Sequence, residues 1–511
     1  MALHPLNEYF TATGEWYLPE QPDRTITGTL TYTPGRIMLE LQDSFAPLGG
    51  VIYGNEAVNF RRVCGHTRSG ELFTLLAVTR VGMSINFFNR HLAQPDRLNV
   101  ALAIIGAVTE DDPVLANVDC RVPGLAVWLS RPAITTNFAD AGNGCTMAFE
   151  VMPLPAETIH IPALSANIVF DVNTTAKPGP FALQVTSVGS WRLEPDTPQP
   201  LSWYLNQIPA VNAFLSLCAG VTMTPDCITL PASPGQERPS LLARRPPEEH
   251  CGITDLRFFF LSRGAFADHF EQGLARWFEH YPAFETTNGL AMSILASRTL
   301  WPHVEFLSVM QALEGFHRVR HGGLYMDKHA YEAVASTLSG AIPKEVGADH
   351  LTSLKSRIRY GNEISLSKRL TLLCEGLAKP LRTMLYGDSP KLLRRWIDTR
   401  NYYTHWDDAL RDRILDGQNL IYAIARLRAL LRVLYLDLMG IPQQTILQGL
   451  TGTNNEAQFL IQIRGIERRA QNPDDTSGAI MVVQRGKRPL PETQANDSAA
   501  SAKPEDGSTT S

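Results

Sequence analysis

Hydrophobic and polar positions follow two different patterns along the chain, and the change falls near residue 250. Ahead of it, β-branched and apolar residues form short runs that alternate with polar ones and end at Gly, Pro, Asn or Asp, as is typical of strands and tight turns. Pro is frequent between residues 153 and 200, which argues against long helices there. We therefore expect a β-dominated domain with few helical inserts over residues 1–230. Its expected strands include residues 25–33, 36–41, 72–81, 98–108, 124–129 and 181–193.

The second half carries apolar residues at three- and four-residue spacing, which is the pattern of amphipathic helices. Ser389-Pro390 is a favourable helix start, because Ser suits the N-cap and Pro the first helical position. A long helix is expected to end before Gly440. These signals predict an α-helical bundle over residues 255–470, and the fold class is α+β with two domains. The expected helical stretches are residues 266–283, 290–319, 351–385 in two pieces broken near 360–362, and 414–439.

The composition of two further segments predicts a linker and a tail rather than folded elements. Residues 231–254 hold several prolines and mixed charge, so we expect a linker, part of it held against a neighbouring surface. Residues 471–511 are rich in Ser, Asp, Pro, Ala and Thr and are expected to form a disordered tail. One apolar run, residues 479–483, interrupts that tail, and we interpret it as an unused hydrophobic patch rather than a docked strand.

Composition places the chain among ordinary globular proteins. Of its 511 residues, 44% are hydrophobic and 19% charged, which is enough to bury a large core and excludes wholesale disorder or a collagen-like repeat. The seven cysteines include no Cys-x-x-Cys pair, so neither a disulfide framework nor a zinc ribbon is indicated. There is no secretion signal and no stretch near 18 apolar residues. We expect a cytoplasmic protein that does not cross a membrane.

Charge is distributed unevenly. Residues 1–230 contain 12 basic and 20 acidic side chains, whereas residues 301–440 contain 20 basic and 15 acidic ones. The helical region is therefore the part that would attract a polyanion such as a nucleic acid. Solvated Lys and Arg on ordinary helix faces would give the same difference, so charge alone does not decide between the two interpretations.

The familiar catalytic motifs are missing from the sequence. It has no Gly-rich phosphate loop, no G-x-S-x-G elbow and no His-Glu-x-x-His zinc motif. His250-Cys251, downstream of Cys227, does not define a tetrahedral metal site. We therefore predict no metal and no cofactor, and histidines remain as the candidates for proton transfer near neutral pH.

The candidate site is Arg400-Asn401-Tyr402-Tyr403-Thr404-His405. Spacing alone carries little information, because Arg61/His66, Arg245/His250 and Arg298/His303 repeat it and Arg263/His269 nearly does. In the 400–405 copy, however, Asn follows the Arg, and Asn401 and His405 are four residues apart and so share one face of a helix. Glu314 and Arg318, also four apart on an earlier predicted helix, would add a carboxylate and a guanidinium to the same groove.

These features resemble a known superfamily. Arg-Asn-x-x-x-His at a helix start, preceded by a Glu-x-x-x-Arg helix, is similar to the HEPN ribonucleases. Residues 306–318 (FLSVMQALEGFHR) and 357–370 (RIRYGNEISLSKRL) resemble more narrowly the HEPN domain of ApeA-like phage-defence proteins. Residues 14–19 (GEWYLP), 28–30 (GTL) and 52–54 (IYG) resemble the ApeA N-terminal domain. The resemblance extends over about residues 10–445.

The resemblance implies a homodimeric, metal-independent endoribonuclease with two Arg-x4-His motifs facing each other. RNA carries its own nucleophile, the 2′-hydroxyl, so the enzyme needs a proton acceptor, a proton donor and a cation for the phosphorane. His405 would exchange protons, Arg400 would bind phosphate, and Asn401 would orient the histidine or a phosphate oxygen. The products would be a 2′,3′-cyclic phosphate and a 5′-hydroxyl. The phage-defence resemblance implies abortive infection as the outcome. Because the acidic N-terminal domain is a poor RNA binder and a toxic RNase must be kept silent, we expect that domain to be a sensor of a phage protein or a protein-interaction module that restrains the nuclease.

Structural roles remain open for each of these residues. His405 would then be a half-buried helix histidine, Arg400 a surface partner of Asp398 or Asp407, and Glu314 with Arg318 an ordinary helix pair. Tyr402 and Tyr403 either stack on bases or pack in the core or a dimer interface, while Trp396 and Trp406 are assigned to the core. The alternative functions are a catalytically silent HEPN dimer that binds RNA and a dimeric adaptor whose tail recruits a partner.

Overall fold

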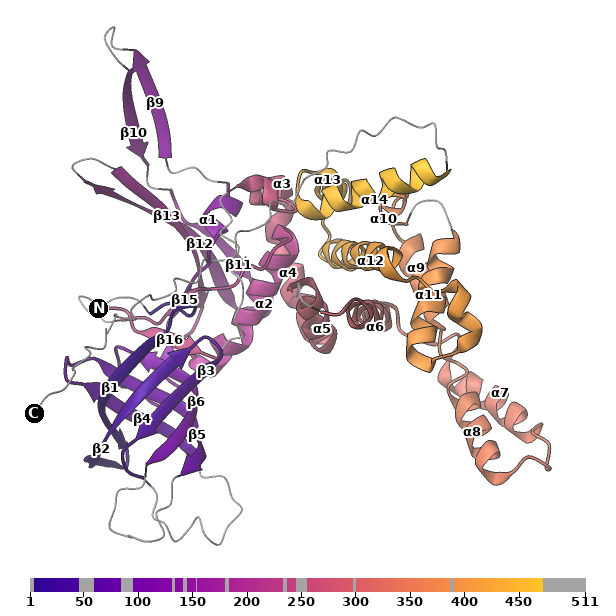
Figure 1. Ribbon diagram of the computed structural model, residues 1–511, viewed down its shortest axis with the longest axis horizontal. Helices are drawn as coiled ribbons and strands as arrows, with labels where there is room; N and C mark the ends of the chain where they lie inside the picture. Colours follow the sequence, from indigo (N-terminus) through magenta and orange to yellow (C-terminus); the bar gives the residue numbers. More distant parts are fainter. Residues whose placement is uncertain are drawn as a thin grey trace, which may run out of the picture. The chain divides into compact units, whose positions relative to one another are not determined.

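The computed structural model describes most of the chain (Figure 1). Its contacts divide the chain into two units, Met1–Ile463 and Arg464–Ser511. In the second unit, the described part is the end of one helix. Most of the predicted tail, including the apolar run at 479–483, lies outside the described residues. These are residues 4–45, 59–83, 95–130, 134–140, 145–152, 154–179, 183–232, 237–244, 255–296, 300–386 and 390–471.

The front half is built on one antiparallel sheet, whose described strands run in the order β11-β12-β13-β8-β15-β16-β6-β3-β2-β1-β4-β5. β5 also pairs with β6, so the last six strands of this order close into a ring. Two small pairings, β9–β10 and β7–β14, lie outside it. The strands are β1 Phe10–Leu18, β2 Gln21–Thr33, β3 Arg36–Leu41, β4 Asn59–Thr67, β5 Leu72–Met83, β6 Asp96–Ile105, β7 Val114–Leu115, β8 Val118–Arg121, β9 Ile134–Asp140, β10 Cys145–Val151, β11 Glu157–Ile161, β12 Ala166–Pro178, β13 Leu183–Pro195, β14 Gln199–Pro200, β15 Cys227–Thr229 and β16 Ser240–Ala243.

Buried and exposed side chains alternate along the strands of the ring. In β2, Ile26, Gly28, Leu30 and Tyr32 are buried, while the threonines that alternate with them are partly exposed. Trp16 of β1 is fully buried, and its Nε1 donates a hydrogen bond to the carbonyl of Gly28 at 3.1 Å. The Trp16 ring occupies the space that a side chain at Gly65 would need. These contacts confirm the strands predicted around 25–41.

Helices interrupt the front half at two places where sequence patterns did not indicate them. Residues 124–129 were predicted as a strand, which is wrong, because Leu125–Trp128 form helix α1. This helix packs so closely against β13 that a Cβ at Gly189 would clash with its backbone. Helix α2 (Leu201–Ala219) is apolar on most of its surface and is largely buried. Such a helix has no polar face and so lacks the amphipathic signature, and Pro209 inside it gives a further false signal against a helix.

Part of the predicted linker belongs to the sheet. β16 lies within residues 231–254 and pairs with β6 from Ser240 to Ala243. Its Leu241 and Leu242 are fully buried. A strand of four residues among prolines is too short for its alternation to show in the sequence. Residues 233–236 and 245–254 of that predicted linker lie outside the described parts.

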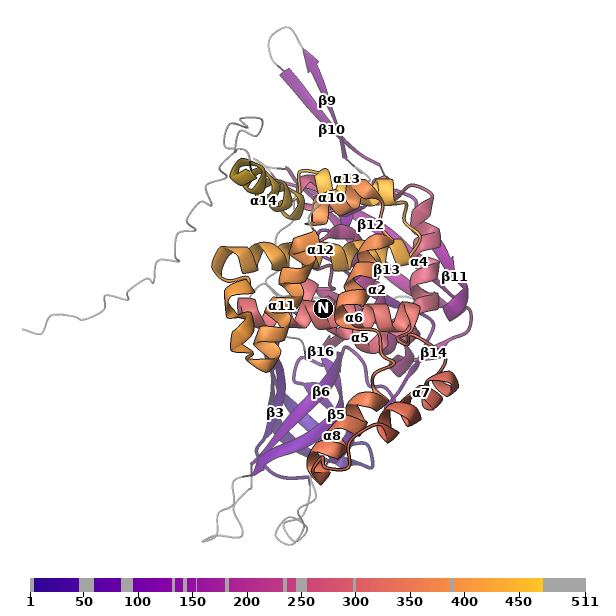
Figure 2. The ribbon, with the colours of Figure 1, turned by 90° about the vertical axis from the view of Figure 1, so that its right-hand side faces the viewer.

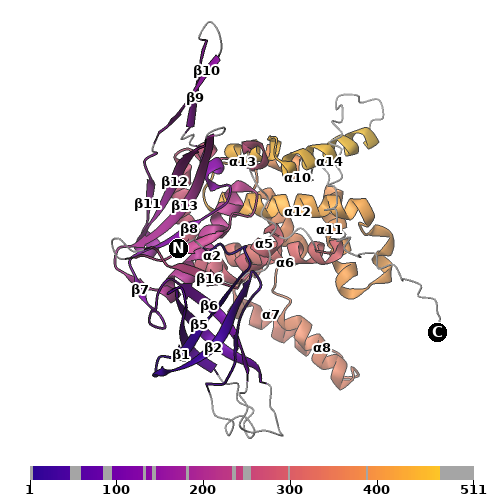
Figure 3. The ribbon, with the colours of Figure 1, turned by 60° about the vertical axis from the view of Figure 1, so that its left-hand side comes forward.

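The second half is helical, so the predicted α+β fold class is confirmed. The core helix α12 packs against α6, α10 and α13 (Figures 2 and 3). α6 also contacts α9 and α11. α7 and α8 contact each other and contain no buried residue. The helices are α3 Arg263–Phe266, α4 His269–His280, α5 Glu285–Ala296, α6 Pro302–His321, α7 Lys328–Gly340, α8 Ala348–Arg359, α9 Leu366–Glu375, α10 Lys379–Tyr386, α11 Pro390–His405, α12 Gly417–Leu438, α13 Gln443–Thr451 and α14 Asn455–Gln471.

Buried polar contacts connect the sheet half to the helical half. Arg432 of α12 donates to the carbonyls of Ser216 and Leu217 at 3.3 and 2.9 Å, at the end of α2. Trp277 of α4 donates to the carbonyl of Ala210 at 2.9 Å. Because these donors are buried, each bond is costly to lose. The two halves of the first unit therefore share one continuous core.

Among the described helices, none is both long and apolar enough to span a bilayer.

Replacing Leu241 by alanine tests whether β16 is part of the sheet. We expect the L241A substitution to lower the free energy of unfolding by about 3 kcal/mol, because it opens a cavity beneath a buried strand. Leu338 of α7 is the matched control, since it is 48% exposed and L338A should change stability by less than about 0.5 kcal/mol. Urea denaturation of the two variants gives both values, and equal values would show that residues 240–243 do not contribute to the core.

Candidate active site

One helix carries the three residues predicted to be catalytic. α11 packs through Trp396, which is fully buried as predicted, and through Ile397. Arg400 and Asn401 are partly buried on its last turns, and His405 is its final residue and exposed. The motif was expected at a helix start and instead lies at a helix end. The Ser-Pro start signal at 389–390 indicates the beginning of this same helix, sixteen residues long.

The residue after His405 has an unusual backbone. Trp406 has a φ of 53°, and its N–H donates to the carbonyl of Tyr402 at 2.6 Å. This left-handed conformation ends the helix and is usually taken by glycine. Trp406 is 69% exposed, so its assignment to the core was wrong. The sequence signal was misleading because tryptophan is usually buried, whereas here the turn directs it outward.

Polar contacts join α11 to α6. Glu314 Oε2 lies 3.9 Å from Arg400 Nη2, and Glu314 Oε1 lies 3.4 Å from Arg318 Nη2. Arg400 also donates to Asn401 Oδ1 at 3.3 Å. The structure therefore brings four of the five predicted residues together. In the described part of the chain, no side-chain hydrogen bond or ion pair links His405 to these four, and it lies one helical turn beyond Asn401.

A third element contributes a carboxylate. Glu363, in the turn between α8 and α9, accepts from Arg318 Nη2 at 2.9 Å. This hydrogen bond raises the pKa of the Arg318 guanidinium. Arg318 therefore has two carboxylate neighbours, Glu314 and Glu363, whereas Arg400 has one at a longer distance. Of the two guanidinium groups, that of Arg400 is thus better able to bind a further anion.

Sequence reasoning missed a buried arginine below these residues. Arg369 of α9 is fully buried and donates to the carbonyls of Ile364 at 2.9 Å and Gly322 at 3.2 Å. Its Nη1 also lies 3.2 Å from Nδ1 of His317, which must accept because guanidinium has only donors. These bonds hold the loop after α6 against the start of α9, next to Glu363. Arg369 lies in the 357–370 segment on which the resemblance rested, but nothing in its spacing distinguishes it from a surface arginine.

His317 is the buried histidine of the site. It is 1% exposed, and burial, followed by the charges of His321 and Arg369, lowers its pKa to about 4. The neutral form is thus favoured, with Nδ1 accepting from Arg369 and the proton on Nε2. His317 is part of the internal support of α6 and is not placed to exchange protons with solvent.

Aromatic side chains surround the end of α11. Tyr402 is buried, and its ring centroid lies 5.9 Å from that of Trp406 and 5.5 Å from that of Tyr403. Tyr403 in turn lies 6.1 Å from His303 at the start of α6. Tyr402 thus packs inward as expected, while Trp406 offers an exposed ring beside His405.

Known families match both halves of the chain. ApeA N-terminal domain 1 matches residues 11–277, which is more than half of the chain, and Apea-like HEPN matches residues 307–445. The chain belongs to the family of ApeA N-terminal domain 1, and its helical part carries an Apea-like HEPN match. No curated protein and no solved structure matches it. The resemblance drawn from short motifs is thereby confirmed over both parts.

The two ApeA-like matches place the candidate residues within the family. Glu314, Arg318, Arg400, Asn401 and His405 all lie in the HEPN match. The N-terminal match extends beyond residue 230 through β16 and into α4. This family consists of HEPN nuclease-like defence proteins, and the chain shares that general assignment. The 52–54 motif of the N-terminal resemblance lies outside the described residues.

The buried His317 should make stability depend on pH. Its pKa of about 4 in the folded state is below the value near 6.5 expected when unfolded, so the unfolded chain binds the proton more readily. We expect the free energy of unfolding to fall by up to about 3 kcal/mol from this group as pH decreases from about 6.5 to 4. Urea denaturation at pH 7.5, 5.5 and 4.5 measures the change.

The His317→Asn variant should lose this part of the pH dependence, since asparagine keeps an acceptor near Nδ1 but does not titrate. His329 of α7 is the matched control, because its side chain is 89% exposed and H329N should behave like the wild type. A His317→Asn variant with an unchanged pH profile would contradict the proposed origin.

Proposed function

We propose that the chain is a metal-independent endoribonuclease that acts as a HEPN homodimer in the cytoplasm. The observation that supports it best is the contact between α6 and α11, which holds Glu314, Arg318, Arg400 and Asn401 together within the HEPN match. His405 follows on the same helix and is exposed to solvent. A cation held by the polar group and an imidazole at the end of the same helix suit phosphodiester chemistry.

In the proposed reaction, the 2′-oxygen of RNA attacks the adjacent phosphorus. One imidazole removes the 2′-hydroxyl proton while the 2′-O–P bond forms, and another donates a proton as the P–O5′ bond breaks. The products are a 2′,3′-cyclic phosphate and a 5′-hydroxyl. Arg400 stabilises the charge on the phosphorane through guanidinium hydrogen bonds. DNA is inert because it lacks the attacking hydroxyl.

The need for both an acid and a base supports a dimer. One chain supplies a single His405, whereas two motifs facing each other supply two imidazoles and two guanidinium groups. The exposed Trp406 beside each His405 gives a flat apolar surface on which a base of a single-stranded RNA can stack. The net charge of residues 301–440, with 20 basic and 15 acidic side chains, agrees with a polyanionic substrate.

The acidic N-terminal domain is proposed as the regulator that senses a phage protein. Its excess of acidic side chains makes it a poor surface for RNA. The buried bonds between α2 and α12 connect it directly to the HEPN helices. A catalytically silent HEPN dimer is the second candidate, and the presence of both Arg400 and His405 weighs against it.

RNA cleavage in EDTA tests the proposed activity. Total cellular RNA is incubated with the full chain, with and without lysate from infected cells, and the ends of the fragments are identified. We expect wild-type cleavage with 2′,3′-cyclic phosphate ends, and a loss of at least about 100-fold in the Arg400→Ala and His405→Ala variants, because each removes a group that acts in the transition state.

The chain provides a matched control with the same spacing. Arg61 and His66 are also five residues apart but lie exposed on β4, in the sheet half. The R61A and H66A variants should cleave like the wild type. Cleavage that survives both Arg400→Ala and His405→Ala would contradict the proposed site, and intact RNA with lysate present would favour the silent dimer.

Glu314 is proposed to position Arg400 rather than to react. The Glu314→Gln variant keeps the shape of the side chain but loses its charge, so Arg400 is less well held. We expect kcat to fall about tenfold while KM for RNA stays the same or decreases, because a negative charge near the phosphate is removed. Steady-state kinetics on a short RNA measure both constants.

Glu332→Gln on α7 is the control for Glu314, since the Glu332 side chain is 65% exposed and its variant should match the wild type. A rise in KM with unchanged kcat in the Glu314→Gln variant would show that Glu314 contributes to RNA binding and does not position Arg400.

A further inference from the structure

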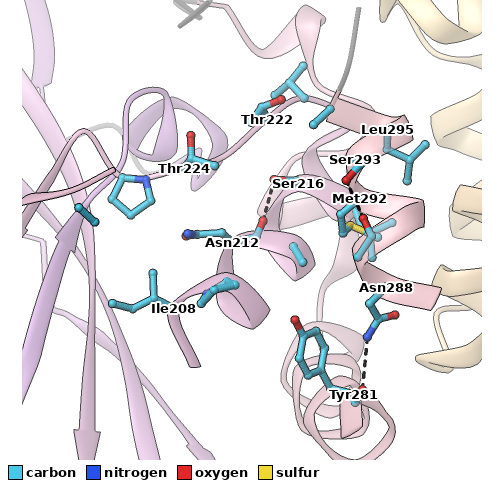
Figure 4. Close-up of a pocket in the computed structure, with 18 of the residues that line it drawn as sticks. Ile208, Asn212, Ser216, Thr222, Thr224, Tyr281, Asn288, Met292, Ser293 and Leu295 are labelled. Carbon is cyan, nitrogen blue, oxygen red and sulfur yellow. Dashed lines mark hydrogen bonds between the residues drawn. The ribbon is translucent and has the colours of Figure 1, made fainter. Parts of the chain in front are cut away.

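The cavity shown in Figure 4 is separate from the candidate nuclease residues. It has a volume of about 500 Å³ and is lined mainly by apolar residues of α2 and α5. None of the five candidate residues lines it. His405 is instead exposed at the end of α11. An RNA strand that reaches His405 therefore extends over the surface of the neighbouring helices.

The helices α7 and α8 project from the rest of the helical half (Figures 1 and 3). Neither contains a buried residue. The turn that follows α8 returns to the bundle at Glu363, which accepts from Arg318 Nη2 at 2.9 Å. Arg318 in turn contacts Glu314, and Glu314 contacts Arg400. The end of α8 is thus connected to the candidate site by a continuous series of polar contacts.

The second half of α8 carries cations without neighbouring acids. Lys355, Arg357 and Arg359 are exposed, and no described residue forms a hydrogen bond or ion pair with their side chains. Asp349 lies in the first turn, at the other end of the helix, and residues 350–362 contain no Asp or Glu. Cations in the last turn also favour the helix dipole, but this reason does not apply to Lys355. Three such charges attract a polyanion.

These cations surround one open face of α8. The half-buried positions of the helix are Leu351, Leu354 and Ile358. Their spacing of three and four residues defines one side, and α8 contacts α7. At 100° per residue, Lys355 and Arg357 fall on the two borders of the opposite side, and Arg359 falls between them. The other exposed residues on that side include the small Ser353 and Ser356, so the face is open to a ligand.

An exposed aromatic ring stands at the end of this open face. Tyr360 is 60% exposed and keeps helical backbone angles, so its side chain leaves from the same side as that of Ser356. The backbone that follows is held firmly: Asn362 is buried, and its side chain donates to the carbonyl of Met326 and accepts from the N–H of Met326. The Tyr360 ring is therefore presented to solvent from a fixed backbone, which suits stacking against an unpaired base.

The composition of the open face favours RNA over a protein partner. Val334 and Leu338 are exposed on α7, where they would suit an apolar partner. On α8, by contrast, Tyr360 at its end is the only large hydrophobic side chain that is exposed. Cations, hydroxyl groups and one aromatic ring match the phosphates and bases of a single strand.

We propose that the open face of α8, together with Tyr360, binds single-stranded RNA and directs it to the candidate site. The delivery of RNA to Arg400 rests on the proposed nuclease function, whereas the binding itself does not. Lys355, Arg357 and Arg359 contact phosphates, and Tyr360 stacks on a base. None of these contacts reads the edge of a base, so the surface prefers unpaired RNA to a duplex but has little sequence preference.

Binding is measured with a labelled single-stranded RNA of about 12 nucleotides, within the usual size of such sites. All its 2′-hydroxyl groups are methylated, so it cannot be cut. Fluorescence anisotropy of the full chain at several salt concentrations gives the affinity and its salt dependence. We expect the combined Lys355→Gln, Arg357→Gln and Arg359→Gln variant to bind at least about tenfold more weakly near physiological salt. The slope of log K against log salt should fall by about two, since each lost phosphate contact removes about 0.7.

Tyr360 is tested separately. Tyr360→Ala should weaken the binding of the single strand about tenfold, because one base loses its stacking partner, and should leave the salt slope unchanged. Tyr360→Phe keeps the ring and should bind like the wild type. The same RNA paired with its complement offers no free base, so Tyr360→Ala should not change its affinity.

The sheet half provides a matched control with the same change in charge. Arg36, Arg68 and Lys177 are exposed there, and their combined replacement by Gln should leave RNA binding unchanged. If the α8 triple variant is unstable, Arg359→Gln alone should lower the salt slope by about 0.7. In cleavage assays, the α8 triple variant should raise KM for RNA while kcat stays close to the wild-type value, because these residues bind substrate and do not react.

The proposal is overturned if the wild type does not bind the methylated RNA, or if the α8 variants keep the wild-type affinity and salt slope. An equal loss in the sheet-half control would also overturn it, because net charge would then explain the binding. Reduced self-association of the α8 triple variant with unchanged RNA binding would assign the face to a contact between copies of the chain. RNA that is bound through α8 but never cut would instead contradict the proposed nuclease and support this surface.

Discussion

The structure depends most on the buried guanidinium of Arg432. It lies in the core helix α12, yet its donors go to the last carbonyls of α2 and to Glu456 of α14. The last carbonyls of a helix lack the partners that continue the helix, so they attract a cation. The Ser216 carbonyl also accepts from the N–H of Gly220 at 3.0 Å. Removing the arginine would take one donor from the buried carbonyls on one side and the cation from the Glu456 carboxylate on the other. The sheet half and the HEPN helices are therefore held in one core by a contact that neither half makes alone.

A second buried arginine stabilises the candidate site by hydrogen bonds, as Arg432 stabilises the core. Arg369 satisfies loop carbonyls and His317, which fixes the end of α6 against α9. Glu363 then stands beside Arg318, and Glu314 remains available to Arg400. The exposed residues of the candidate site are thus supported by the buried pair Arg369 and His317. In the proposed reaction Arg400 binds a phosphate, and its weak contact of 3.9 Å with Glu314 is compatible with that exchange of partners.

The sequence was informative where one physical signal dominated. Period-two alternation located β2, β3, β5 and β6, and three- to four-residue spacing located the helical half, because both patterns reflect one buried face. It failed for α2, which is largely buried, and for β16, which is too short to show a period. Among the candidate residues, helix spacing related Asn401 to His405 and Glu314 to Arg318. It could not indicate the approach of α6 to α11, which is tertiary, nor the turn that exposes Trp406.

The position of His405 follows from these constraints. A histidine buried inside the bundle would resemble His317. Burial and neighbouring cations lower the pKa of His317 to about 4, so its ring stays neutral. Such a ring cannot serve as a proton donor near neutral pH. At the last position of α11, beyond the polar group and before a left-handed turn, the imidazole stays in water while the helix fixes its backbone. In the proposed dimer, the RNA and the second chain would complete the surroundings of this imidazole.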